Sequence, residues 1–477
     1  MDKFSKYLKK KKPLVKSLVE KLSSKYDFVS VLGTDVKGKG YFVDKSSVII
    51  GSSMITECGF VLRVYYKGVY SEYSFSELEE KDIDKIISDM DSLVNENIKI
   101  KKVNANVIVE EELVKKFRRK DNSKIYTPEE IVNALKEYSN YGLSINDKVL
   151  NVKVGAEFNE ISKMYISTKR DLEQYYTWNN SQIFALVRDG QNIKYNYNGE
   201  GFATVDETME SFKGSIDDTV KVALELLDST LPVPGVYTII TDPSITGLIA
   251  HEAFGHGLEM DMFVKDRAKS QDYMNKQVAS KLISMHDGAK ATLSAASYFF
   301  DDEGVLAQDT TIIDKGILVG GICDSVSAAI LGYHPTGNGR RESYKRKVYT
   351  RMTNTFFSKG KSKLEDMIKS VDYGYYIVQT NNGMEDPKNW GIQCTALYGR
   401  EIKDGEFTGK IISPVVMSGY VIDLLESISM VSNDFKIEGS GSCGKGHKEW
   451  VRVSDGGSCI KAQVKIGWVW LKRLLKH

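Results

Sequence analysis

The segment HEAFGHG, residues 251–257, decides which fold and site this sequence must form, because it combines metal-binding residue types at an unusual spacing. Zinc peptidases commonly carry H-E-x-x-H, in which two histidines four residues apart share one face of an α-helix. Here the spacing between His251 and His256 is five, and on a regular α-helix they would point about 140° apart. A π-type turn brings such residues to one side, and Gly255 and Gly257 give the backbone that freedom. The segment predicts a metal site on a distorted helix, with two unrelated histidines in a buried helix as the alternative.

A metal site of this kind needs more than two histidines. A catalytic zinc site has three protein ligands, an open position and a carboxylate that accepts a proton from water. Glu252 follows His251 directly and is the candidate general base. Cys443 lies in the glycine-dense loop EGSGSCGKGH (438–447); such a loop can bring a thiolate close to an ion, although a lone cysteine is more often inert and buried. Residue type alone leaves the third ligand open among Cys443, His447, His334, His286 and Cys459.

The same loop also matches nucleotide-binding patterns in part. The glycines of GSGSCGKG (439–446) satisfy G-x-G-x-x-G, and Gly444 with Lys445 nearly completes G-x-x-x-x-G-K-[ST]. Both patterns require a strand before the loop and a helix after it, because the helix N-terminus holds the phosphate. The residues that follow, HKEWVRV (447–453), read as a strand. A nucleotide-dependent enzyme is therefore the weaker alternative.

Composition indicates a soluble globular protein. The chain has 477 residues, of which 42% are hydrophobic and 27% charged, and this length favours two or three domains. The net charge of +1 gives no basic bias toward nucleic acid. No signal peptide and no apolar run long enough for a membrane span is recognisable. The five scattered cysteines suit a reducing compartment, so we expect a cytoplasmic location.

The pattern of apolar residues predicts an α+β fold with mixed helices and largely antiparallel sheets. Helical spacing is expected over residues 13–22, 127–142 and 215–229, and strands with turns over 40–75. The alternation over 156–204 predicts an antiparallel meander.

The proline-rich segment LPVPG (231–235) is the best candidate domain boundary. We expect an N-terminal α/β part over residues 1–230. Residues 231–477 then form a second domain that contains the metal-site helix and a C-terminal β-rich region. The lysine run 9–12 is interpreted as a solvated helix end.

Five segments in one order distinguish the second half of the chain. They are HEAFGHGLEMD (251–261), SYFFDDEG (297–304), TGNGRRES (336–343), RMTNTFF (351–357) and GSCGKG (441–446). Together they resemble the TldD/PmbA family of metallopeptidases, on the metal-bearing TldD side. The resemblance covers about residues 230 to 460 and is loose in the N-terminal half.

The resemblance implies a zinc ion held by His251, His256 and Cys443, with Glu252 as the general base. It implies hydrolysis of small or unfolded peptides, including peptide maturation. It also implies pairing with a metal-free TldE/PmbA-like paralogue that encloses the active site, with a homodimer as the alternative. The loop after Cys443 departs from the family's usual sequence, which concerns the local loop structure.

Some features are open to more than one interpretation. A non-catalytic, peptide-binding subunit of the same family is the alternative function, although Glu252 and the three implied ligands are present. The residues DDEG (301–304) are interpreted as a structural turn rather than an acidic metal cluster. The tail GWVWLKRLLKH (467–477) is expected to form a short amphipathic helix. Three arginines either bind peptide or stabilise the fold: Arg340, Arg341 and Arg351.

Overall fold

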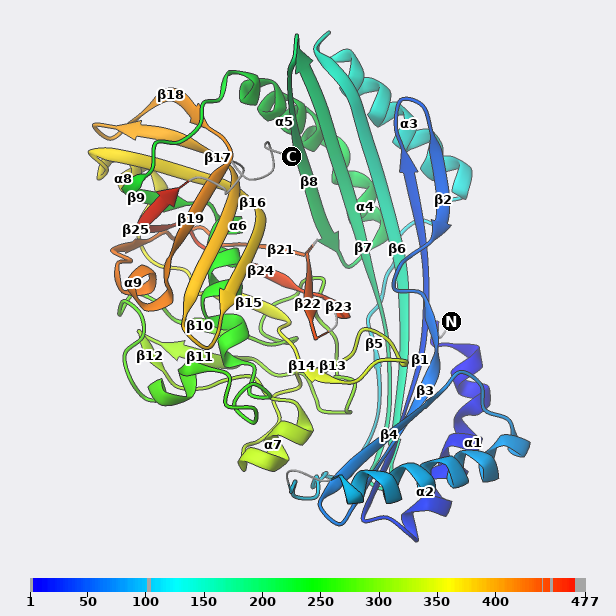
Figure 1. The fold of residues 1–477 in the computed structure, drawn as a ribbon. Coiled ribbons are helices and arrows are strands. Elements are labelled where there is room, and N and C mark those ends of the chain that lie inside the picture. The colour runs from blue at the N-terminus through cyan, green and yellow to red at the C-terminus, as the bar shows by residue number, and fades with distance from the viewer. Residues whose placement is uncertain (1–2, 101–103, 440, 447–448, 468–477) are drawn as a thin grey trace, which may run out of the picture.

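A computed structural model describes residues 3–100, 104–439, 441–446 and 449–467. It has an α+β fold in which a long sheet stands beside a group of smaller sheets (Figure 1). The predicted mixture of helices and largely antiparallel sheets is confirmed. The long sheet is built from strands that end by residue 202, and the strands of the other sheets begin at residue 235. The predicted boundary at 231–235 falls between them, and the division into two domains stays a prediction. The end helix predicted in the tail falls on residues 468–477, outside the described residues.

The long sheet has eight strands in the order β4-β3-β1-β6-β7-β5, with β2 paired to β1 and β8 paired to β7. Its pairs are antiparallel except for the parallel pair β5–β7. The meander predicted over 156–204 is confirmed as β6, β7 and β8. The strands are β1 (Phe28–Val43), β2 (Val48–Ser52), β3 (Glu57–Tyr66), β4 (Val69–Phe75), β5 (Leu113–Arg118), β6 (Val149–Ser167), β7 (Arg170–Asp189) and β8 (Asn192–Phe202).

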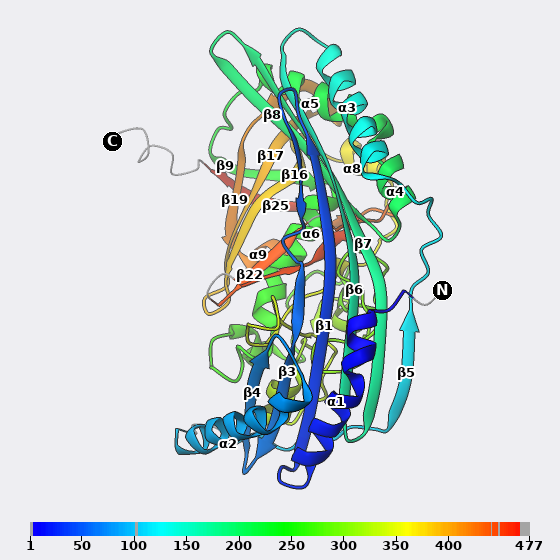
Figure 2. The same cartoon turned by 90° about the vertical axis from the view of Figure 1, so that its right-hand side faces the viewer.

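Helices cover one face of the long sheet, and the C-terminal half of the chain lies on the other face (Figure 2). α1 and α2 pack their apolar side chains on β1 and β3, whereas α3 and α5 pack on β6 and β7. A capping box begins α3, in which Thr127 and Glu130 cap each other's backbone N–H groups. The helices are α1 (Lys6–Ser23), α2 (Ile83–Lys99), α3 (Pro128–Ser144), α4 (Val205–Glu210) and α5 (Phe212–Glu225).

The lysine run in α1 differs from the prediction. The helix begins at Lys6, capped by the Ser5 hydroxyl, rather than at Pro13, so the run lies inside the helix. Lys11 is only 5% exposed and pairs with Glu79 on the chain segment before α2. Lys12 pairs with acidic residues of β7 on the sheet below. The interpretation as a solvated helix end was therefore wrong for Lys11 and Lys12, because acidic side chains distant in sequence neutralise them. Lys9 and Lys10 are exposed, as that interpretation expects.

No helix among the described residues has both the length and the apolar character needed to cross a membrane. The cytoplasmic location stays a prediction.

The second half of the chain forms two larger sheets and two hairpins. A seven-stranded sheet runs β16-β9-β25-β19-β17-β18, and the added pairing of β16 with β17 closes its first five strands into a ring. A six-stranded sheet runs β12-β11-β10-β15-β24-β21, while β13–β14 and β22–β23 pair separately.

The strands of the seven-stranded sheet are β9 (Gly235–Thr241), β16 (Tyr373–Asp386), β17 (Gly391–Lys403), β18 (Glu406–Ile412), β19 (Val415–Tyr420), β20 (Met430–Val431) and β25 (Ile460–Gly467). Those of the six-stranded sheet are β10 (Met285–Asp287), β11 (Thr310–Asp314), β12 (Ile317–Leu318), β15 (Asn354–Phe357), β21 (Lys436–Glu438) and β24 (Ser454–Gly457). The remaining elements are β13 (Gly339–Arg340), β14 (Tyr349–Thr350), β22 (Ser442–Lys445), β23 (Glu449–Arg452), α6 (Pro243–Ile249), α7 (Ser325–Leu331), α8 (Leu364–Lys369) and α9 (Val421–Glu426).

The turn DDEG (301–304) joins the two halves of the molecule. Asp302 forms an ion pair with Lys163 of β6, and Glu303 forms one with Arg63 of β3. The Asp301 carboxylate accepts hydrogen bonds from backbone N–H groups, including that of Gly339 at 2.8 Å. All three acids are buried. The structural interpretation of this turn agrees with these contacts.

Candidate metal centre

The HEAFGHG segment continues α6 but changes its winding. Asp242 caps α6 by accepting the Ile245 N–H, and the helix passes at Ala250 into a π-helical segment, Ala250–Gly255. A single 3₁₀ turn, His256–Leu258, then ends it. Because the π turn holds an extra residue, the two imidazole rings come together, with centroids 5.2 Å apart. The predicted distortion of this helix is confirmed.

Glycines allow the segment to pack closely. A Cβ atom at Gly247 would overlap the backbone of Gly456 in β24, and one at Gly255 would overlap the Met352 sulfur. A Cβ atom at Gly383 of β16 would approach the Glu252 side chain to 2.5 Å. The segment is therefore wedged against two sheets, which holds its histidines in place.

Cys443 reaches the two histidines from the β22–β23 hairpin. It lies opposite Val451 in the hairpin register, and its Sγ atom is 3.5 Å from the His256 Nε2 atom. One ligand atom from each of His251, His256 and Cys443 falls within 4.8 Å of the others. The structure therefore brings these three residues together.

Their chemistry fits a zinc ion. Imidazole nitrogens and cysteine thiolates are both zinc ligands, and ligand atoms on a tetrahedral zinc stand roughly 3.5 Å apart. Burial alone would raise the pKa of Cys443, but the neighbouring His251 and His256 hold it well below its usual value. Burial by itself would lower the pKa of His251. The Cys443 thiolate has the opposite effect, and the resulting pKa is raised to about 9. The pocket thus favours the thiolate form that a metal ligand requires.

Glu252 lies beside this group and is 9% exposed. Its Oε2 atom is 4.0 Å from the His256 Nε2 atom, so the carboxylate faces the side on which the donor atoms meet.

Carboxylates stand behind both histidines, a buried one at His256 and a half-buried one at His251. Glu259 Oε2 lies 3.2 Å from His256 Nδ1, and Asp455 Oδ2 lies 3.7 Å from His251 Nδ1. Metal-bound histidines commonly have such carboxylate partners. The sequence interpretation missed both acids. Glu259 was detectable because it lies three residues after His256, whereas no local signal links Asp455 to His251.

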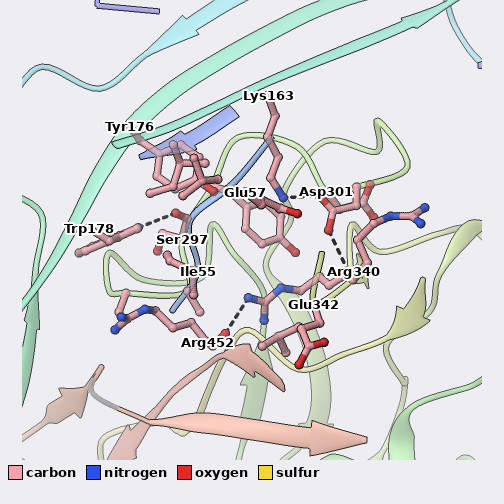
Figure 3. A pocket seen from close by; sticks show the side chains of 18 of the residues that line it. Ile55, Glu57, Lys163, Tyr176, Trp178, Ser297, Asp301, Arg340, Glu342 and Arg452 are labelled. Atoms are coloured by element: carbon pink, nitrogen blue, oxygen red, sulfur yellow. Dashed lines mark hydrogen bonds and ion pairs between the residues drawn. The ribbon is translucent and has the colours of Figure 1, made fainter. Parts of the chain in front are cut away.

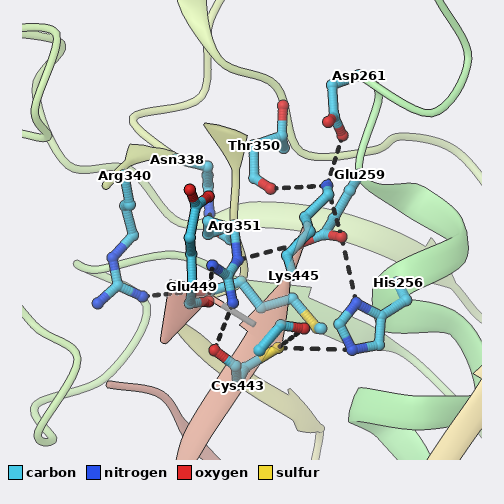
Figure 4. Close-up of polar contacts among 12 residues, drawn as sticks. His256, Glu259, Asp261, Asn338, Arg340, Thr350, Arg351, Cys443, Lys445 and Glu449 are labelled. Atoms are coloured by element: carbon cyan, nitrogen blue, oxygen red, sulfur yellow. Dashed lines mark hydrogen bonds and ion pairs between the residues drawn. The ribbon is translucent and has the colours of Figure 1, made fainter. Parts of the chain in front are cut away.

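Charged side chains connect the Cys443 strand to this group (Figure 4). Lys445 donates to Glu259 at 2.9 Å and to Asp261 at 2.6 Å. Arg351 donates to the Cys443 carbonyl at 2.5 Å. The lysine that resembled a phosphate-binding residue is therefore bound to carboxylates.

The structure shows which element follows the glycine-dense loop and which groups the arginines contact. The loop is followed by β23 rather than by a helix, which contradicts the nucleotide-binding alternative. Arg340 donates to the carbonyls of Met352 and Arg452. Arg341 donates to Glu72 and to the Arg346 carbonyl. These contacts, like those of Arg351, stabilise the fold. A role of the three arginines in peptide binding stays a prediction.

The other candidate ligands lie elsewhere or outside the described residues. His286 pairs with Asp309 at 2.9 Å and stacks on Phe356. Cys459 is buried in a different apolar cluster. Neither these two nor His334 belongs to the group of metal-binding side chains found among the described residues. His447 lies outside the part of the chain that the structure describes.

A cavity of about 110 Å³ adjoins the hairpin that carries Cys443 (Figure 3). It opens between the inner face of the long sheet and the C-terminal half, and Trp450, Val451 and Arg452 of β23 form part of its wall. Aromatic side chains of both halves, including Trp178 and Tyr298, line it as well. A second cavity of about 390 Å³ has Asp455 in its wall.

Comparison with known proteins gives the family. Residues 234–455 match the family model described as the PmbA/TldA metallopeptidase C-terminal domain. A protein named metalloprotease TldD homolog, from Buchnera aphidicola, is 35% identical over 264 residues, covering 54% of this chain and 53% of that protein. The chain thus spans about half the length of this curated relative.

Two further matches extend over more of the chain. A zinc metalloprotease TldD homolog from Saccharolobus solfataricus is 28% identical over 312 residues, covering 62% of this chain and 68% of that protein. The crystal structure of TldE from Thermococcus kodakarensis has a TM-score of 0.75 at 18% identity, covering 95% of this chain and 99% of that chain. It shows a shared fold. The family model and the curated relatives carry the conclusion that this chain belongs to the TldD/PmbA family.

Proposed function

We propose that this protein is a zinc-dependent peptidase that hydrolyses small or unfolded peptides. The observation that carries the proposal is the meeting of His251, His256 and Cys443 beside the Glu252 carboxylate. The names of the two TldD homologs, a metalloprotease and a zinc metalloprotease, support the same chemistry.

The residues of the site have different roles in the proposed reaction. His251, His256 and Cys443 hold the metal, and a bound zinc ion supplies a Lewis acid that polarises the peptide carbonyl and acidifies water. Glu252 accepts a proton from the attacking water and passes it to the leaving amine. The surrounding apolar core, which includes Leu248 and Phe254, excludes bulk water and strengthens these electrostatic effects.

The substrate binds in an extended form. A site that recognises mainly peptide backbone accepts many sequences, which suits peptide maturation or turnover in the cytoplasm. The cavity beside β23 (Figure 3) offers room for a substrate side chain next to the Cys443 hairpin.

A partner subunit completes the active site. We expect a metal-free paralogue of the TldE type, because the fold matches TldE of Thermococcus kodakarensis over 95% of this chain. Exposed apolar side chains on the long sheet support an interface: Phe184 is 37% exposed, Ile193 54% and Tyr195 38%. A homodimer remains the second arrangement. Enclosing the site protects folded proteins from cleavage.

Replacing Glu252 tests the proposal directly. Glu252→Gln keeps the shape of the side chain but removes the base, so peptide hydrolysis falls by about 10²–10⁴. The zinc content stays at about one ion per chain, as for a catalytic zinc site, because the side chain is not a ligand. Cleavage of a fluorogenic casein-derived peptide and elemental analysis measure both quantities. The exposed Glu426→Gln in α9 is the control.

Two other outcomes would point elsewhere. Full activity in Glu252→Gln would contradict the role of this base. A parent chain that binds zinc and peptides but cleaves none, alone or with its paralogue, would favour the alternative of a non-catalytic peptide-binding subunit.

A further inference from the structure

The hairpin that carries Cys443 is not part of either larger sheet. β22 and β23 pair with each other in a two-stranded sheet of their own. His256 lies 187 residues earlier in the chain, on the π-helical side of the site. No strand pairing among the described residues ties the hairpin to that segment, so side chains must fix the distance between the two groups.

Lys445, two residues after Cys443, provides one such link. Its Nζ atom donates to Glu259 Oε2 at 2.9 Å, to Asp261 Oδ1 at 2.6 Å and to the Thr350 carbonyl at 3.1 Å. The lysine side chain is only 11% exposed. Charge-assisted hydrogen bonds of this kind are strong and directional.

The same Glu259 oxygen connects Lys445 to His256. Glu259 Oε2 lies 3.2 Å from His256 Nδ1 and 2.9 Å from Lys445 Nζ. A carboxylate at Nδ1 fixes the orientation of the ring and directs Nε2 to the opposite side, where Cys443 Sγ lies 3.5 Å away. One side chain thus touches both ligand-bearing segments.

Arg351 provides a second link from a third segment. It donates to the Cys443 carbonyl at 2.5 Å and to the Glu449 carbonyl at 3.1 Å, so it holds both strands of the hairpin. Its Nε atom is 3.9 Å from Glu259 Oε1, and both side chains are 1% exposed. Glu259 therefore lies between two cations, Lys445 of the hairpin itself and Arg351, which binds the hairpin.

Two buried cations, Lys445 and Arg351, face the carboxylates of Glu259 and Asp261. Lys265 pairs with Asp261 from the exposed edge of this cluster. Removing one partner of a buried pair leaves an uncompensated charge, which is strongly unfavourable. Losing Lys445 therefore disturbs Glu259 and, through it, the His256 ring.

We infer that Lys445 is a positioning residue that sets Cys443 and His256 at the separation needed for a shared metal ion, through the carboxylate of Glu259. This inference rests on the proposed function, because it assumes that the two residues bind one metal. It also gives a role to the lysine of the GKG sequence, which has no role once the nucleotide-binding alternative is contradicted.

Cobalt binding tests the inference without relying on activity. Co²⁺ is added to the metal-free chain, and the visible d–d bands and the near-ultraviolet thiolate-to-cobalt band are recorded. Lys445→Met is expected to bind Co²⁺ about 10–100-fold more weakly than the parent, as for other residues behind metal ligands. Its thiolate band per bound cobalt should also weaken. Lys445→Arg should recover part of both.

Lys265→Met is the matched control. Lys265 also pairs with Asp261, at 3.2 Å, but its ion pair is with this carboxylate rather than with Glu259. Its cobalt affinity and spectrum should equal those of the parent. If Lys445→Met does not fold, as judged by circular dichroism, Glu259→Gln replaces it. That change removes the negative charge that Lys445 and His256 share but leaves an amide oxygen that can still accept a hydrogen bond.

The outcomes separate the two proposals. A parent that binds Co²⁺ through a thiolate, with an unchanged affinity and spectrum in a folded Lys445→Met or Glu259→Gln variant, would overturn the positioning role alone. A parent that binds no Co²⁺ would overturn the proposed metal site and this inference together.

Discussion

Asp455 stands behind His251, with its Oδ2 atom 3.7 Å from the His251 Nδ1 atom. The two residues come from different elements, β24 and the π-helical segment, which pack directly on each other. Nδ1 has no hydrogen-bond partner among the described residues. Glu259 has the corresponding position behind His256. Each imidazole therefore has a carboxylate on its Nδ1 side, which favours Nε2 as the metal-binding nitrogen.

The first prediction concerns this carboxylate. Asp455→Asn keeps the size of the side chain but removes its charge, so His251 loses the group that orients its ring. Zinc affinity should fall by about 10-fold. Competition with a chromogenic chelator measures it. Asp189→Asn, at the exposed end of β7, is the control, and equal affinity in all three proteins would contradict the role of Asp455.

The second prediction identifies the third ligand. Cys443→Ala should lose zinc and activity together, because two histidines alone bind zinc weakly. Cys459→Ala should keep both, since Cys459 packs with Ile240 and Met367 in a separate cluster. Elemental analysis after dialysis distinguishes the two variants. Full zinc content in Cys443→Ala would show that another residue is the ligand.

Local sequence patterns predicted the distorted helix at residues 251–257, because the residues that require it are contiguous. The histidines, the glutamate and the glycines all lie within residues 251–257, so their spacing alone implied a wide helical turn. The meander of β6 to β8 was equally accessible, since strand alternation and tight turns are local signals.

The contacts that fix the site were not accessible in this way. Asp455 and Arg351 come close to His251 and Cys443 only through tertiary packing. No hydrophobic periodicity and no sequence motif indicates these two contacts. Lys11 is an instructive error, because a run of lysines normally indicates a solvated surface. It is buried because Glu79 neutralises it. Long-range charge pairing of this kind cannot be read from one segment.

The third prediction tests the wide turn. Gly255→Val places a Cβ atom against the Met352 sulfur in a buried position, so the π turn must shift. The variant should lose about 1–3 kcal/mol of unfolding free energy and bind zinc more weakly. Gly51→Val, where a Cβ atom meets open space, is the control. Denaturant unfolding and zinc titration measure the two effects, and a Gly255→Val protein with parental zinc affinity would contradict them.

The fourth prediction concerns assembly. Tyr195 stacks on Phe184 with ring centroids 5.4 Å apart, and both rings are more than one-third exposed. Tyr195→Glu introduces a charge that a buried apolar interface excludes, so the dimer should weaken by at least about 10-fold. Analytical ultracentrifugation, with and without the paralogue, measures this. Tyr141→Glu, on exposed α3, should leave association unchanged, and a parent that is a fully active monomer would overturn the proposed interface.

The last prediction concerns stability and pH at the junction of the two halves. Glu57 lines the cavity beside β23 (Figure 3) and accepts the Tyr344 N–H at 2.8 Å. Burial raises the pKa of Glu57 from 4.5 to about 7, although Lys163 nearby lowers it. Between these values the folded chain keeps a proton that the unfolded chain has lost. The contribution of Glu57 to stability is therefore present below pH 4.5 and is lost as the pH rises to about 7.

Glu57→Gln has no proton to lose and can still accept the Tyr344 N–H. Relative to the parent, the variant should therefore gain stability as the pH rises, with nearly all of the gain appearing between pH 4.5 and about 7. The melting temperatures of both proteins are measured across this range. Subtracting one from the other removes the effect of all other titrating groups, which the two proteins share. The exposed Glu426→Gln provides the comparison. A difference between Glu57→Gln and the parent that is constant with pH would mean that Glu57 titrates alike in the folded and unfolded chains, and that burial at this junction does not hold its proton.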